Sequence, residues 1–328
     1  MIICRTPMRI SFFGGGTDFP KWYNDNEGSV ISTSIDKYCY VTSRFLPNIF
    51  NYNFRLRYFV TEEVKKISDI KHPSYREILK KYPTKGKTLE LVHNADLPAM
   101  SGLGSSSSST VSAINAMNAL LKQKISKEKL AKEAIEIEQN ILKDHVGSQD
   151  QVIASYGGFN LINFKKNNKF SVMPIKNKKN INTIQSSILL IYTGIQRNAS
   201  VVEKDKFINF QKNIQYYKNI NDITKEVYNN LISKNFCIKK FGELLSHQWE
   251  NKKLLSRRVS NKFIDEMYSA GIEMGAYGGK LLGAGSGGFL LFICNDYAKK
   301  KIIKKLKNNF NIPIKFDFSG SKILKTSI

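Results

Sequence analysis

The 328-residue sequence lacks any apolar stretch near the ~20 residues that a membrane-spanning helix requires. Its first residues, MIICRTPMRISFF, also lack the basic region, apolar stretch and small-residue cleavage site of a signal peptide, in that order. We interpret their short apolar stretch as a first β-strand. With hydrophobic residues at 41%, these absences predict a soluble, cytoplasmic protein with a packed core and no membrane partner.

Cysteine is also scarce. None of the four cysteines forms a CxxC pair or has histidines at metal-ligand spacing, which argues against a zinc site. Each lies beside apolar residues, so we expect buried free thiols, as is typical of a reducing compartment. The four are Cys4, Cys39, Cys237 and Cys294.

Acidic residues are few beside basic ones: 27 Asp and Glu against 51 Lys and Arg, a net charge of +24. One hypothesis that such a charge suggests is a nucleic-acid-binding protein. The lysines are, however, spread among asparagines, as in KKNNKF at 165–170, and no RNP, zinc-finger or helix-turn-helix motif accompanies them. We therefore favour solvated Lys/Asn-rich surfaces and no nucleic-acid partner. A local positive excess would also attract an anionic substrate.

Strand-like segments and helical stripes are mixed along the chain. We expect strands at 2–13, 30–45, 90–93, 187–194, 287–294 and 313–318. We expect helices at 111–121, at 127–141 with Ser126 as N-cap, over most of 200–274, and at 297–310. Because no regular βαβ rhythm appears, an α+β fold is favoured over a doubly wound sheet. The polar stretch 165–187 reads as a turn-rich connection between two domains, 1–180 and 181–328.

A Gly/Ser-rich segment, PAMSGLGSSSSS at 98–109, opens the first of these helices. Gly102 and Gly104 allow positive φ and close approach of a ligand to the backbone. The helix start then offers unpaired N–H groups and the positive end of its dipole. A flexible linker would not pass straight into an amphipathic helix, so we interpret the segment as a phosphate-binding loop. It is not a Walker A loop, because no Gly-Lys-Ser/Thr follows.

Two acidic residues follow this loop. Glu138 falls on the apolar stripe of its helix with Ala134 and Ile141. An inward carboxylate needs a cation or donors, which Mg²⁺ bound to nucleotide phosphates would supply; an acid at the edge of the stripe is the equal alternative. Asp150 lies in a polar segment just before an apolar, strand-like stretch. It could take a proton from a hydroxyl group, or it could simply be a turn residue.

Two more glycine-rich segments stand near the ends of the chain. RTPMRISFFGGGTD at 5–18 places Arg9 in a β-patterned segment and Asp18 after a glycine turn. GGKLLGAGSGG at 278–288 precedes a buried strand, for which a structural hairpin is the alternative. Each signal alone is weak.

Taken together, the segments resemble the GHMP kinases, which include galactokinase, homoserine kinase, mevalonate kinase and phosphomevalonate kinase. Three motifs occur in the family's order over almost the whole chain: RTPxRIS with GGGTD, PxxxGLGSS at 98–106 and GAGSGG at 283–288. The resemblance implies a two-domain α+β fold with a ribosomal-S5-like N-terminal domain, a ferredoxin-like C-terminal domain and an active-site cleft between them. It also implies ATP and Mg²⁺ as cofactors.

The resemblance assigns roles to single residues. In sugar kinases of the family, a Glu twelve residues before the Asp of a G-x-x-D-Q segment binds Mg²⁺, which matches Glu138 and Asp150. Ser106 then resembles the second metal ligand, with Ser105 as fallback, Asp150 the catalytic base and Arg9 the cation beside it. The implied ATP contacts are Pro98, Ser101, Gly102, Leu103, Gly104, Ser105, Ser106 and Ser107. The implied substrate contacts are Gly15, Gly16, Thr17, Asp18 and Gly285, with Arg197 and Lys280 as candidates for a substrate phosphate.

One branch of the family fits most closely. The segments at 12–20, 148–159, 193–197 and 278–285 look like those of the D-glycero-D-manno-heptose 7-phosphate 1-kinases. This implies ATP-dependent phosphorylation of the C1 hydroxyl to the 1,7-bisphosphate, in GDP-heptose and surface-polysaccharide synthesis. GGGTD at 14–18 replaces the GEHTD of galactokinases, which removes an acid and a histidine beside a phosphorylated sugar.

Rival hypotheses are a fucokinase- or galactokinase-like enzyme, an isoprenoid-acid kinase and a non-catalytic ligand sensor. Ser107 and Ser108 depart from the small alanines usual in the family, a change that we expect to be tolerated. A homodimer remains open.

Overall fold

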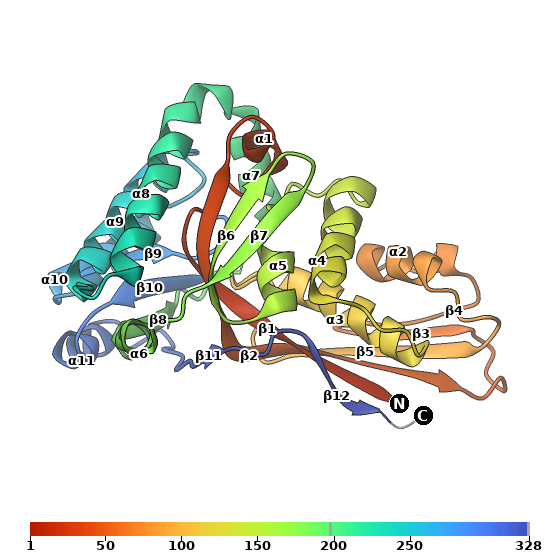
Figure 1. Cartoon of the computed structure of the whole chain (residues 1–328). Coiled ribbons are helices and arrows are strands. Elements are labelled where there is room, and N and C mark those ends of the chain that lie inside the picture. The colour runs from red at the N-terminus through yellow and green to blue at the C-terminus, as the bar shows by residue number, and fades with distance from the viewer. Residues whose placement is uncertain (197–198, 327–328) are drawn as a thin grey trace.

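The protein's structure, a computed structural model, describes residues 1–196 and 199–326. Within these ranges the strands form a large nine-stranded sheet and a small three-stranded sheet, with helices packed on both (Figure 1). Strands and helices alternate without a βαβ rhythm, so the predicted α+β class is confirmed. None of the described helices is both long and apolar enough to cross a membrane.

The large sheet is built around two long strands, β1 (Ile2–Phe13) and β2 (Gly28–Leu46). Its main order is β12-β1-β2-β5-β3-β4, with β5 (Thr88–Ala95), β3 (Phe54–Arg57), β4 (Thr61–Val64) and β12 (Lys322–Thr326). β6 (Phe159–Lys165) and β11 (Phe316–Asp317) also pair with β2, and β7 (Lys169–Pro174) pairs with β6. Thus β2 ties the two ends of the chain into one sheet.

The register of β1 against β2 shifts between Pro7, which faces Tyr38, and Arg9, which faces Ser34. Proline cannot donate a ladder hydrogen bond, and such irregularities turn the next side chain to a new direction. This bulge precedes Arg9, one of the candidate site residues.

Helices α3 (Ser105–Leu120), α4 (Lys127–Ile135) and α5 (Gln149–Tyr156) lie together against the large sheet, beside α2 (Pro73–Lys81) (Figure 1). The predicted cap of α4 is confirmed, because the Ser126 side chain accepts a hydrogen bond from Lys129 N at 3.2 Å. α4 continues directly into η2 (Glu136–Ile141), a turn of π-helix. The remaining short elements are α1 (Pro20–Tyr23), η1 (Ile67–Asp69) and η3 (Gln211–Asn213).

The small sheet has the order β8-β10-β9, from β8 (Ile188–Tyr192), β10 (Phe289–Ile293) and β9 (Gly278–Leu281). Helices α6 (Lys178–Ser187), α9 (Ile238–Leu254) and α10 (Lys262–Glu273) contact it, and α11 (Asp296–Lys305) packs on α10. α7 (Ala199–Ile208) shares its core through Val202, whereas α8 (Ile214–Ile232) packs on α9 and on β2 of the large sheet. Phe12 and Phe13 of β1 pack edge-on against Phe241 of α9, at ring distances of 5.6 and 5.1 Å. One apolar core therefore joins the two sheets.

Several sequence predictions were wrong in detail. The stretch after Asp150 is helix α5 and not a strand, because an apolar run buried on all sides has no period that separates the two. The supposed connection at 165–187 contains β7 and α6. Ile141 is 46% exposed, since the wider π-turn breaks the 3.6-residue stripe, and Cys237 is exposed.

The C-terminal end also differs from the prediction. The expected strand at 313–318 is reduced to β11, and β12, which was not predicted, pairs with β1 with Ile2 opposite Thr326. The last two strands thus belong to the sheet of the first half, and the proposed division at residue 180 stays a prediction.

Candidate functional site

A partly buried ion pair occupies the junction of β1 and α5. The Arg9 guanidinium donates from Nε to Asp150 Oδ1 and from its second terminal nitrogen to Asp150 Oδ2, both at 2.6 Å. Its other terminal nitrogen donates to the Gly102 carbonyl at 2.6 Å, and Arg9 N donates to Leu103 O at 3.0 Å. Bidentate Arg–carboxylate pairs hold both groups in one plane, so Asp150 has a defined direction. Arg9 ties this carboxylate to the Gly/Ser loop.

The Gly/Ser loop touches the ion pair where the backbone is left-handed. Gly104 has φ +74 and a Cβ there would lie 3.1 Å from Asp150 Oδ2 and 3.2 Å from Arg9 Cγ. Gly104 is also the residue before α3, so the unpaired amide end of this helix starts beside Asp150. Such a helix start favours an anion.

The second glycine-rich segment packs on the first. A Cβ at Gly102 would lie 2.7 Å from Leu282 O, and one at Gly288 would lie 2.3 Å from Ser101 O. Two segments far apart in sequence can approach this closely only because both contacts are glycines. Gly285, at φ +129, instead packs against Val259.

The predicted ATP contacts differ in exposure. Pro98 and Ser106 are exposed, whereas Ser101 and Leu103 are fully buried. Ser107 is buried as well, and its hydroxyl points to Glu138. The individual contacts of this segment with ATP stay predictions.

Glu138 is directed inward, as its position on the helix indicated, and is only 3% exposed. Its Oε2 accepts hydrogen bonds from Ser107 Oγ at 2.7 Å and Gln151 Nε2 at 2.5 Å. Burial raises the pKa of this carboxyl to about 7, and the charge of nearby Asp150 adds to the effect. Its Oε1 is buried and has no hydrogen-bond partner among the described residues. A hard cation would satisfy this oxygen, so the residues fit a Mg²⁺ site.

The serine that reaches Glu138 is Ser107, although the family resemblance indicated Ser106 as the second metal ligand. Gln151 was not predicted at all. The sequence shows that Gln151 follows Asp150 directly. A neutral amide occurs in many environments, however, so its bond to Glu138 could not be predicted without the structure.

Asp18 closes the glycine turn after β1 and is 1% exposed. Its carboxylate accepts from Gly16 N at 2.9 Å and from Gln149 N at 3.2 Å. Burial raises the pKa of this group to about 6 despite these bonds. A Cβ at Gly147 would lie 1.9 Å from Asp18 Oδ2, so only glycine fits there. Thr17 is buried and donates to Gly14 O at 2.9 Å, which shapes the turn.

The same turn lies close to α5. A Cβ at Gly15 would lie 3.6 Å from Ser11 Oγ and 3.7 Å from Gln149 Nε2. The Ser11 hydroxyl and Gln149 Oε1 are buried without a partner in the part of the chain that the structure describes. Sequence reasoning missed both side chains, which lie beside Gly15 of this turn.

Of the two residues predicted to hold a substrate phosphate, Arg197 lies outside the described residues. Lys280 is 2% exposed and donates to the carbonyls of Ser11 at 3.2 Å and Phe12 at 2.8 Å. Burial, with the nearby Arg9 charge, lowers the pKa of its ammonium to about 7. Its amine contacts the main chain of β1, so the predicted phosphate contact receives no support from this position.

Comparison with known proteins identifies the family. The chain is 30% identical to the D-glycero-alpha-D-manno-heptose 7-phosphate kinase of Campylobacter jejuni, over 96% of both chains. This chain is a GHMP kinase. Residues 70–158 match the pattern of the GHMP kinases N terminal domain, and residues 231–312 match the GHMP kinases C terminal pattern.

Solved GHMP kinase structures share the fold. A structure titled D-glycero-D-manno-heptose 1-phosphate kinase, from Bacteroides thetaiotaomicron, has a TM-score of 0.81 at 24% identity and covers all of both chains. A putative sugar kinase from Campylobacter jejuni has a TM-score of 0.73 at 27% identity, over 98% of this chain and 97% of that one. The predicted two-domain GHMP-kinase fold is thus confirmed. The protein is a phosphotransferase, and its family implies ATP as the phosphate donor.

Proposed function

We propose that this GHMP kinase transfers the γ-phosphoryl group of ATP to the C1 hydroxyl of D-glycero-D-manno-heptose 7-phosphate, giving the 1,7-bisphosphate. The product would serve GDP-heptose and surface-polysaccharide synthesis. The choice of sugar is supported by the full-length relative named as a kinase of this heptose phosphate. One observation above all supports the proposed chemistry: the bidentate Arg9–Asp150 pair lies next to Gly104, the residue that precedes α3.

Asp150 is the proposed base. Its carboxylate is fixed by two charge-assisted bonds and remains partly exposed, at 21% of the side chain, so a hydroxyl could still reach it. Arg9 holds both carboxylate oxygens of Asp150 from one side, which fixes the direction from which the carboxylate can meet a hydroxyl. Phosphoryl transfer gains most of its rate from positioning and electrostatic stabilisation, and both side chains serve that purpose here.

The start of α3 is the proposed phosphate site. Residues 104–107 supply main-chain N–H groups at the positive end of a 16-residue helix, a favourable place for the phosphates of ATP. Glu138, through its unpartnered Oε1, with Ser106 or Ser107 would hold Mg²⁺ beside them. The ion would neutralise phosphate charge when bound. Because Mg²⁺ requires the carboxylate form, the raised pKa of Glu138 makes this binding dependent on pH.

The glycine turn at 14–18 is the proposed sugar site. Asp18 is held by two main-chain amides and lies close enough to Asp150 for their charges to interact. Ser11 Oγ and Gln149 Oε1, which have no hydrogen-bond partner within residues 1–196 and 199–326, lie near the same turn, and such atoms are suited to sugar hydroxyls.

A coupled assay of ADP release tests the proposal across acceptors: the heptose 7-phosphate, fucose, galactose and mevalonate. We expect kcat/KM to be highest for the heptose 7-phosphate by at least a hundredfold. Faster turnover of any other acceptor would transfer the assignment to that substrate. A 1-phosphate signal in the ³¹P NMR spectrum of the product identifies the position, and phosphate at another carbon would contradict the C1 assignment.

A further inference from the structure

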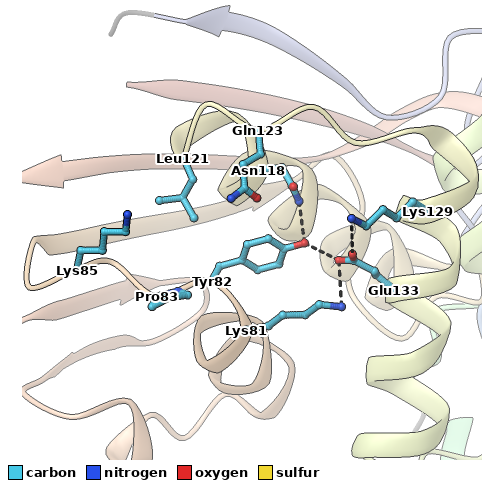
Figure 2. A pocket seen from close by; sticks show the side chains of 9 residues that line it. All are labelled: Lys81, Tyr82, Pro83, Lys85, Asn118, Leu121, Gln123, Lys129 and Glu133. Atoms are coloured by element: carbon cyan, nitrogen blue, oxygen red, sulfur yellow. Dashed lines mark hydrogen bonds and ion pairs between the residues drawn. The ribbon is translucent and has the colours of Figure 1, made fainter.

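A separate polar cavity lies at the C-terminal end of α3, where Asn118 and Leu121 line it (Figure 2). Its volume is about 300 Å³, the lower end of the range for small-molecule sites. α3 begins beside Asp150 and ends at Leu120, and its 16 residues separate the two places by about 24 Å at 1.5 Å per residue. The cavity is therefore distinct from the proposed ATP and sugar sites. Its lining includes Lys81, Tyr82, Lys85, Asn118, Gln123, Lys129 and Glu133.

The inner wall of this cavity is a buried polar network. Tyr82 Oη donates to Glu133 Oε2 at 2.5 Å, and Asn118 Nδ2 donates to Tyr82 Oη at 2.8 Å (Figure 2). All three are buried, with Glu133 8%, Tyr82 6% and Asn118 5% exposed. A satisfied buried network keeps a defined shape, so the wall is rigid before any ligand arrives.

The outer wall carries positive charge. Lys81 Nζ lies 3.4 Å from Glu133 Oε2, and Lys129 Nζ lies 4.0 Å from its Oε1. Lys85, on the turn after α2, has no ion pair among the described residues. The lining thus holds three ammonium groups and one carboxylate, which leaves the cavity with a net positive charge. A second cavity of about 520 Å³ is lined by the same Lys81, Lys129 and Glu133, so a ligand could extend beyond the first.

We propose that this cavity binds a small metabolite bearing phosphate or carboxylate groups, and that its binding inhibits the kinase. The oxyanion would replace Glu133 as the partner of Lys81 and Lys129 and would also engage Lys85. The amide of Gln123, at the rim, would donate to the same ligand.

The route to the active site runs through two helices that are joined at two points. On α3, Ser107 and Asn118 are eleven residues apart, about three turns, and so lie on the same face. Ser107 bonds Glu138, and Asn118 reaches Glu133 through Tyr82. Glu133 and Glu138 lie five residues apart on α4 and the π-turn that continues it.

Because both acids belong to one continuous helical segment, a shift of Glu133 moves the turn that carries Glu138. π-turns are rare and concentrate at functional sites, which fits a segment with two arrangements. The inhibition, though not the binding, rests on the proposed metal-binding role of Glu138.

Isothermal titration calorimetry with inorganic phosphate as the probe tests the binding. The double variant Lys81→Ala/Lys85→Ala is compared with wild type and with Lys304→Ala/Lys305→Ala on α11, which loses the same charge elsewhere. We expect phosphate affinity to fall at least tenfold in the first variant and to stay within twofold in the control. Phosphate can also bind at the start of α3, but it does so in all three proteins, so this binding does not contribute to the difference in affinity between them. Equal affinities in all three, or an equal loss in both variants, would overturn the site.

Steady-state kinetics test the inhibition. Saturating phosphate should raise KM for ATP at least twofold more in wild type and in the α11 control than in the Lys81/Lys85 variant. Asn118→Leu, which cuts the bond to Tyr82, should keep phosphate binding and lose this extra rise. The coupling is refuted if phosphate raises KM for ATP as much in Asn118→Leu as in wild type. It is also refuted if phosphate raises KM for ATP no more in wild type than in the Lys81/Lys85 variant. A failed heptose assignment would change the acceptor in these assays but would leave the calorimetric result as it is.

Discussion

Replacing Arg9 with lysine keeps the positive charge near Asp150 and removes the planar fork that orients it. Arg9 makes three side-chain hydrogen bonds of 2.6 Å, two to the Asp150 carboxylate and one to Gly102 O, with only 7% of its side chain exposed. A lysine amine is a compact charge and can keep at most one of the two bonds in the fork. The carboxylate would then rotate, and the tie to the Gly/Ser loop would be lost.

The size of the effect follows from these bonds. Hydrogen bonds to charged groups contribute about 1.5–3 kcal/mol each, and such values are not additive. Loss of two, partly offset by the retained charge and by water, corresponds to about 3 kcal/mol, or roughly a hundredfold in kcat. Misplacement of a base by about 1 Å gives a loss of the same order.

We would obtain kcat for Arg9→Lys from the rate of ADP formation at saturating ATP and sugar phosphate. Arg5→Lys is the matched control on the same strand, where the guanidinium lies 3.8 Å from Asp317 and over the Tyr38 ring. We expect Arg5→Lys to keep kcat within about twofold, because Asp317 and Tyr38, the partners of Arg5, are not part of the proposed site. If Arg9→Lys turns over within threefold of wild type while its thermal unfolding is unchanged, the fork does not position the base.

Three further predictions concern the same site. Asp150→Asn should lower kcat by several powers of ten while ATP still binds in a calorimetric titration, and near-normal turnover would remove Asp150 from the role of base. Glu138 has a pKa raised from 4.5 to about 7, so the unfolded chain loses this proton first and stability should fall as pH rises from about 4.5 to 7. Mg²⁺ affinity should rise over the upper part of that window. In Glu138→Gln this pH dependence of Mg²⁺ affinity should be lost, and the fall in stability should shrink to the part that Asp18, with its own raised pKa of about 6, contributes; a wild-type profile in that variant would refute the assignment. Gly147→Ala should destabilise the fold by about 1–3 kcal/mol in thermal unfolding and raise KM for the sugar, because its Cβ would meet Asp18 Oδ2 at 1.9 Å; an unchanged KM would separate Asp18 from the sugar.

Local backbone conformation and helix capping could be predicted from the sequence. Gly102 and Gly104 have the positive φ that a phosphate loop needs, and Ser126 caps its helix, because both features depend on a few neighbouring residues. The strands at 188–192 and 289–293 followed from short apolar runs. Helical periodicity gave an inward Glu138 as one of two equal alternatives, and the structure shows this side chain buried. The family motifs supplied its relation to Asp150.

Contacts between distant segments were decided by the tertiary structure alone. β12 is a polar strand that forms only because β1 offers a free edge more than 300 residues earlier in the chain. Ser107, and not Ser106, reaches Glu138 because of how α3 packs on the π-turn, and Lys280 is buried because β1 covers it. A sequence specifies which groups are charged or able to bond, but their partners depend on packing, and burial then sets pKa values such as those of Asp18 and Glu138.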